Sequence, residues 1–168
     1  MAIDPGFVQR LALLIQDERA GLQGFIALLQ REEALLVTTQ IDALSALAEQ
    51  KTALYRALQR LSDERVLMFA RLGAKVSDEN IRIVLADLPE ALTAWQEVVG
   101  LAAEAKERNR INGQLITERL QNNQQALSVL LRDNATRSSV APIDWALLGQ
   151  QMPAGQAPRL LSDLLAAA

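Results

Sequence analysis

Four charged residues interrupt two long apolar seams, and their spacing limits how this chain can fold. Both seams lie in runs without proline, where apolar residues recur in alternating steps of three and four, as in packed amphipathic helices. The charges are Glu18 and Glu32 in the first seam, and Lys51 and Arg65 in the second. Within each seam the two charges are 14 residues, or two heptads, apart.

These four charges predict an antiparallel helical hairpin with one register. In such a hairpin the numbers of facing residues add up to a constant, and both Glu18 with Arg65 and Glu32 with Lys51 give 83. The same register sets apolar residues opposite one another and places the turn near residues 40–42. A slip by one heptad would set a charge against a leucine, so the pairs would define the register. The alternative is that these long side chains only flank the seam and extend into solvent.

Further signals place the helix ends. Gly73 suits the C-terminal cap of the second long helix, and Ser77 or Asp78 can cap a short connector helix over residues 77–88. Pro89 fits the first turn of a third long helix.

The third long helix is expected to extend to about residue 132, and its middle is unusual. Its seam becomes small and polar there, at Asn109, Asn112 and Gly113. Glycine inside a helix costs roughly 1 kcal/mol relative to alanine, which indicates a close backbone approach or a local bend. We expect these three residues to face a neighbouring helix. The alternative is a polar layer that only fixes the helix register.

The chain is therefore predicted to be all-α, an elongated antiparallel bundle of three long helices with a short connector helix. The expected bundle covers residues 8–132, and consists of a hairpin at 8–73, the connector at 77–88 and the long helix at 89–132. A proline-punctuated amphipathic tail with short helical segments follows at 133–168.

Composition excludes most enzymatic chemistry. The chain has no histidine and no cysteine, which removes Ser-His-Asp and Cys-His catalysis, imidazole or thiolate metal sites and disulfides. No phosphate-binding glycine motif is present, so we expect no enzyme, no cofactor and no metal. A net charge of -3 gives no general attraction to nucleic acid or anionic membrane. No apolar run approaches the roughly 20 residues of a membrane-spanning helix, which predicts a cytoplasmic protein without stable membrane insertion.

Binding through a helical surface remains, and the end of the chain offers the candidates. They are the late third helix and the first apolar patch of the tail: Leu127, Leu130, Ile143, Trp145, Leu147 and Leu148. Trp145 is the strongest single anchor, because interface hot spots favour tryptophan. Alternatively, Trp145 only pins the tail to the bundle.

Two stretches resemble the FlgN family of flagellar export chaperones. One is the second-helix run from Ile41 to Lys51, continuing to Gly73, and the other is residues 109–116, which read Asn-Arg-Ile-Asn-Gly-Gln-Leu-Ile. Helix order and length match from about Val8 to Arg132. The family pattern has a tyrosine soon after the third helix, where this chain has Trp145 in a longer tail.

The resemblance implies a cytoplasmic chaperone. Such a protein binds the C-terminal helices of the hook-associated, or hook–filament junction, proteins FlgK and FlgL. It prevents their premature assembly and delivers them to components of the flagellar type III export apparatus. It also implies that the region after the third helix takes part in binding. The competing hypothesis is a structural helical adaptor or coiled-coil assembly protein without export clients.

Overall fold

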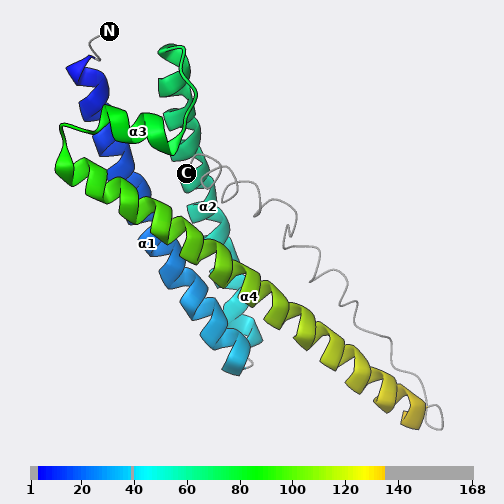
Figure 1. Cartoon of the computed structure of the whole chain (residues 1–168). Coiled ribbons are helices and arrows are strands. Elements are labelled where there is room, and N and C mark those ends of the chain that lie inside the picture. The colour runs from blue at the N-terminus through cyan, green and yellow to red at the C-terminus, as the bar shows by residue number, and fades with distance from the viewer. Residues whose placement is uncertain (1–3, 39, 135–168) are drawn as a thin grey trace.

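The computed structural model describes residues 4–38 and 40–134, which form four helices and no strand. They are α1 (Pro5–Thr38), α2 (Ile41–Arg71), α3 (Asp78–Val84) and α4 (Pro89–Asn134), and Figure 1 shows them as an elongated helical assembly. The short helical segments expected beyond residue 133 lie almost entirely outside the described residues.

Helix α1 is the central element, because it packs along both α2 and α4. Helices α1 and α4 run in the same direction. Arg19 in the first half of α1 binds Glu97 in the first quarter of α4 at 3.0 Å, and Arg119 further along α4 donates to the Val37 carbonyl at 3.1 Å near the end of α1. Helix α2 runs the opposite way, and α3 lies in the connection that brings the chain back to begin α4 (Figure 1).

The predicted hairpin register is confirmed at both charged positions. Arg65 donates to both carboxylate oxygens of Glu18, and Lys51 donates to both oxygens of Glu32, at 2.9 and 3.1 Å. The alternative of solvated side chains is wrong for three of the four residues, because Glu18, Glu32 and Arg65 are buried, while Lys51 is half-buried. The charges are therefore part of the interior.

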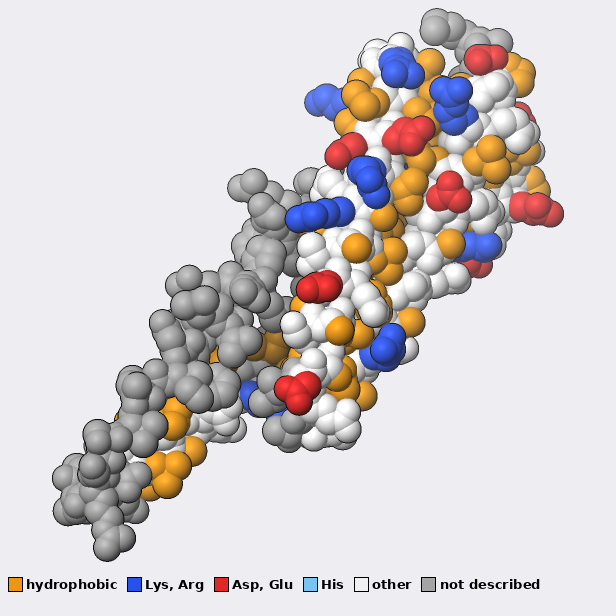
Figure 2. Space-filling model, turned by 180° about the vertical axis from the view of Figure 1, so that it is seen from behind, with side chains coloured by type: hydrophobic (Ala, Val, Ile, Leu, Met, Phe, Trp, Pro, Cys, Tyr) orange, Lys and Arg blue, Asp and Glu red, His pale blue; other side chains and the backbone are white. Residues whose placement is uncertain are grey.

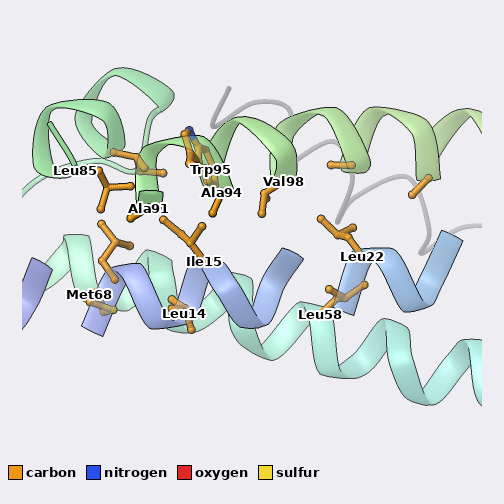
Figure 3. Close-up of a cluster of buried hydrophobic side chains, with 14 of the residues drawn as sticks. Leu14, Ile15, Leu22, Leu58, Met68, Leu85, Ala91, Ala94, Trp95 and Val98 are labelled. Carbon is orange, nitrogen blue, oxygen red and sulfur yellow. The ribbon is translucent and has the colours of Figure 1, made fainter. Parts of the chain in front are cut away.

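The apolar core fills the half of the molecule in which α2 ends and α4 begins. Figure 3 shows side chains of α1, α2 and α4 meeting there, with Leu85 from the end of α3 closing one side. Trp95 on α4 is its largest fully buried side chain. Helices α1 and α2 approach closely at Gly21, where an added Cβ would lie 2.8 Å from Leu58 Cδ2. Leu36 and Leu47 are also buried but lie outside this cluster, beyond the Glu32–Lys51 pair.

The predicted helix ends agree closely with the structure at three positions. Gly73 follows α2 with a φ of 69°, the left-handed conformation that glycine adopts without strain. The Ser77 hydroxyl caps α3 by accepting from the Asn80 amide at 3.1 Å, and α4 begins at Pro89. Helix α3 is shorter than expected and ends at Val84, because the backbone continues in tighter turns in which Ala86 donates to the Ile83 carbonyl and Leu88 to the Leu85 carbonyl.

The polar middle of α4 is only partly as predicted. Asn112 is buried against α1 and Asn109 is half-buried, but Gly113 is exposed. An added Cβ at Gly113 would meet nothing within 4 Å. The expectation of a close helix approach at Gly113 is therefore wrong, because one helical step of about 100° turns this residue away from the α1-facing side occupied by Asn112.

Candidate functional site

Helix α4 continues well beyond the helix that supports it. Helix α1 has 34 residues and ends at Thr38, whereas α4 has 46 residues. Residues 121–134, here called the α4 extension, follow the Arg119 contact to the end of α1. At 1.5 Å per residue they make a rod of about 21 Å. Figure 1 shows this part of α4 projecting past the ends of α1 and α2.

The α4 extension carries large apolar side chains in the open. Every side chain from Gln121 to Leu131 is exposed. The exposed large apolar residues are Leu127 (39%), Val129 (59%), Leu130 (57%) and Leu131 (61%). Hydrophobic side chains are visible at the surface of this end of the molecule in Figure 2. Between Arg119 and Arg132 the sequence has no charged residue, so the extension carries amide, hydroxyl and apolar groups up to Leu131, and its charges are confined to Arg132 and Asp133.

Part of this apolar surface continues the face that packs against α1. Leu130 lies 18 residues after the buried Asn112, which is five turns of about 3.6 residues and therefore the same side of the helix. Leu127 lies about 60° from that line, while Val129 and Leu131 flank it on either side. The α4 seam thus extends past the end of α1, and none of the described residues covers it there.

A polar layer fixes the extension relative to the rest of the molecule. The side-chain amide of Asn112 donates to the Leu29 carbonyl at 2.9 Å and to Glu32 Oε2 at 2.8 Å. Because Lys51 also binds Glu32, this layer joins α1, α2 and α4 at one level. Arg108 adds an ion pair with Glu33 at 3.6 Å. These contacts set the direction in which α4 leaves the bundle.

A second polar cluster lies at the opposite end of the molecule, where α4 begins. Asp78 at the start of α3 accepts from Trp95 Nε1 at 2.6 Å and from Arg82 at 2.6 Å. The buried Arg65 guanidinium lies 5.1 Å from the centre of the Trp95 ring, within the range of a cation–π contact. This cluster ties α3 to α4 far from the α4 extension.

Three carboxyl groups among the described residues have perturbed pKa values. The hydrogen bond from Arg110 lowers the pKa of the exposed Glu107, whereas Glu18 and Asp78 belong to the packed end. Burial raises the pKa of Glu18, and the neighbouring Arg65 opposes that shift. For Asp78, burial acts to raise the pKa, but the hydrogen bonds from Arg82 and Trp95 outweigh it and hold the pKa below its usual value. Both groups are therefore tuned by structural contacts, remote from the α4 extension.

Within residues 4–38 and 40–134, no three His, Cys, Asp or Glu side chains lie together in a way that could hold a metal ion. A shallow, open depression beside Gly113 is lined by residues of α4 alone. None of the helices in these two ranges is both long and apolar enough to cross a membrane.

The structure separates the predicted site residues into two groups. Leu127 and Leu130 lie exposed on the α4 extension. Ile143, Trp145, Leu147 and Leu148 lie outside the described residues. Sequence reasoning missed Val129 and Leu131, because it followed the helical seam, and these two residues flank it. The difference in length between the first and third predicted helices was the signal that could have revealed the whole exposed surface.

Comparison with known proteins shows which family the chain belongs to. The family model described as "FlgN protein" matches residues 1–140. The chain belongs to the FlgN family. The match covers the whole of the FlgN-like helical region, including the α4 extension.

Two curated FlgN relatives support this membership. Both are called "Flagella synthesis protein FlgN" and come from Yersinia enterocolitica, one of them from serotype O:8 / biotype 1B. Each is 26% identical to this chain over 125 residues, which is 73% of this chain and 80% of the relative. No solved structure matches the chain significantly.

Proposed function

We propose that this protein is a cytoplasmic chaperone for flagellar proteins, acting by stoichiometric binding and not by catalysis. Its clients are the C-terminal helices of the hook-associated proteins FlgK and FlgL. By covering these helices it prevents premature assembly, and it then delivers the clients to components of the flagellar type III export apparatus. Membership of the FlgN family and the name of the two relatives support a flagellar role.

The observation that carries the proposal is the α4 seam that continues beyond its partner helix. A soluble protein gains nothing in folding from four large apolar residues held in water, and exposed apolar surface of this kind is typical of binding sites. An amphipathic client helix would lie along the α4 extension in line with α1, taking the place that α1 leaves empty after Thr38. Leu127 and Leu130 would then face the client.

The size of the surface sets the size of the client segment. A rod of about 21 Å accommodates about four turns of a client helix. Full burial of one leucine contributes about 1.5–3 kcal/mol, before the cost of ordering the client is subtracted. Two seam leucines alone therefore give weak binding, and more apolar surface is needed for a stable complex.

The tail at residues 133–168 supplies that additional surface in this proposal. Ile143, Trp145, Leu147 and Leu148 follow closely after the α4 extension in the sequence. They would contact the side of the client helix that α4 leaves open, with Trp145 as the anchor. In this proposal the bundle at 8–132 is the scaffold, and the partner-binding region consists of the end of α4 and the tail.

The experiment is calorimetric titration with a peptide that covers the C-terminal helix of FlgK or FlgL. The double variant L127D/L130D should weaken binding at least tenfold, because it places two charges on the apolar surface. The matched control is Leu13→Asp on α1, where a leucine of 67% exposure lies far from the α4 extension. The control should bind as the wild type does.

The charge of the surface gives a second readout. Because residues 120–131 include no charged side chain, raising the salt concentration from about 0.05 to about 0.5 M should change the affinity little. Unchanged binding by L127D/L130D would exclude the α4 extension as the client site. Failure of the wild type to bind either client peptide would favour a structural adaptor without export clients.

A further inference from the structure

The exposed seam of the α4 extension has a candidate cover in the same chain. The described part of the chain ends at residue 134, at the tip of the extension, and 34 residues follow it. The first apolar segment among them is residues 143–148, which read Ile-Asp-Trp-Ala-Leu-Leu. An apolar surface and an apolar segment are thus separated by one short polar stretch.

We propose that residues 143–148 fold back over the α4 extension in the client-free protein, with Trp145 against Leu127 and Leu130. The cover itself does not depend on the proposed chaperone function. The regulatory consequence of the cover does rest on that function: the two parts of the client-binding surface shield one another until a client helix separates them.

The length of the connection fits this arrangement. Residues 135–142 are eight residues, which reach at most about 28 Å when extended and form a loop of the usual size between two antiparallel helices. Pro142 stands directly before the apolar segment, where it can begin a helical turn. If the chain reverses direction near residue 138, Trp145 lies at the level of Leu131, and Leu148 lies at the level of Ser128. The eight-residue connection is therefore long enough to bring the segment to the level of the exposed apolar side chains.

The tethering of the two surfaces favours the cover over contact with another molecule. Two segments joined by a short linker have an effective concentration in the millimolar range, so even a weak contact is populated. Both surfaces are nearly free of charge, since Asp144 is the single charged residue in the segment and residues 120–131 have none. The contact is therefore apolar and pays little for desolvating charges.

A covered site has a defined effect on client binding. The apparent dissociation constant of a client equals its intrinsic dissociation constant divided by the fraction of the protein that is uncovered. The cover would also keep the seam leucines from associating between copies of the chain before a client arrives. The client-binding surface would thus open only where a client helix competes for it.

The test uses Trp145 as a reporter in the full-length protein. The chain has two tryptophans, and Trp95 is fully buried in the core, so the difference between wild type and W145F isolates the fluorescence of Trp145. In the absence of client, its emission should be shifted to the blue and protected from acrylamide. In L127D/L130D the emission should shift to that of an exposed indole, whereas Leu13→Asp should leave it unchanged. Leu13, Leu127 and Leu130 are exposed, and circular dichroism verifies that the helices of these variants remain.

Linker length and dilution complete the test. Inserting 20 Gly/Ser residues after Arg137 lengthens the eight-residue connection to 28, which should lower the effective concentration about sixfold and increase acrylamide quenching of Trp145. An exposed Trp145 in the wild type, or protection that survives L127D/L130D, would overturn the proposal. Protection that disappears on dilution would also overturn it, in favour of contact between two copies. Because no client is present, these outcomes are independent of whether the client peptides bind.

Discussion

The side-chain amide of Asn112 on α4 donates to Glu32 Oε2 on α1 at 2.8 Å, and the same carboxylate holds Lys51 of α2. The polar layer around this carboxylate thus joins all three long helices at one level. It lies at the boundary between the apolar core and the end of the molecule from which the α4 extension projects. Its loss should therefore affect both stability and the placement of the candidate site.

We expect Asn112→Ala to lower the free energy of unfolding by about 1–3 kcal/mol. The substitution removes both hydrogen bonds of the buried amide and leaves Glu32 with one partner fewer. Urea denaturation measures the effect, with Asn122→Ala on the exposed α4 extension as the control, which should stay within about 0.5 kcal/mol of the wild type. Equal stability of the two variants would show that the polar layer contributes nothing measurable.

The buried pair of Glu18 and Arg65 should behave as a unit. Either Glu18→Leu or Arg65→Met alone should cost about 3–5 kcal/mol, because each leaves one uncompensated charge in the interior. The double variant should regain most of that loss, since desolvation of the two charges is no longer required. A double-mutant cycle in urea measures the coupling. Additive losses in the double variant would contradict the assignment.

Stability in acid should depend on Asp78. Its folded-state pKa is lowered, so the folded protein binds fewer protons at this group than the unfolded chain does. The resulting stability is present above the unfolded pKa of about 3.9 and is lost as the pH falls through the lower folded pKa. The difference in unfolding free energy between wild type and Asp78→Asn should be constant at neutral pH and shrink below about pH 4. Urea titrations at a series of pH values measure it, and a difference that grows in acid would reverse the sign.

Two glycines should respond in opposite ways to the same substitution. Gly113→Ala should raise the free energy of unfolding by up to about 1 kcal/mol, because the position is helical, exposed and open around an added Cβ. Gly21→Ala should be less favourable and is expected to destabilise, since its Cβ would lie 2.8 Å from Leu58 Cδ2 in the packed hairpin. Thermal unfolding of the two variants makes the comparison, and a destabilised Gly113→Ala would mean that α4 approaches a neighbour there.

Removing the tail should separate client binding from stability. Deletion of residues 141–168 should abolish client binding, because Trp145 and its neighbours are lost, while the melting temperature changes little. The buried apolar core is made by residues up to Ala105, which the deletion leaves intact. Calorimetry with a client peptide and thermal unfolding are the two measurements. Unchanged affinity would assign the site to the α4 extension alone, and a large drop in melting temperature would indicate that the tail pins the bundle.

The sequence by itself determined the helices and the hairpin. Helical periodicity is a local property, and proline, glycine and serine act on the backbone within a few residues, so the ends at Gly73, Ser77 and Pro89 could be read directly. The register followed from the spacing of Glu18, Glu32, Lys51 and Arg65. The register is the one unknown of an antiparallel pair, and the two charge pairs independently give the same value for it.

The tertiary structure decided how the helices pack against one another and which residues that packing buries. Periodicity shows that α4 has an apolar side, but not which neighbour covers it or where that neighbour ends. The parallel packing of α4 on α1 set this boundary, and with it the burial of Asn112, the exposure of Gly113 and the free surface at Leu127 and Leu130. Exposure depends on packing between elements distant in sequence, and therefore only the assembled helices could distinguish a core residue from a candidate binding residue on the same seam.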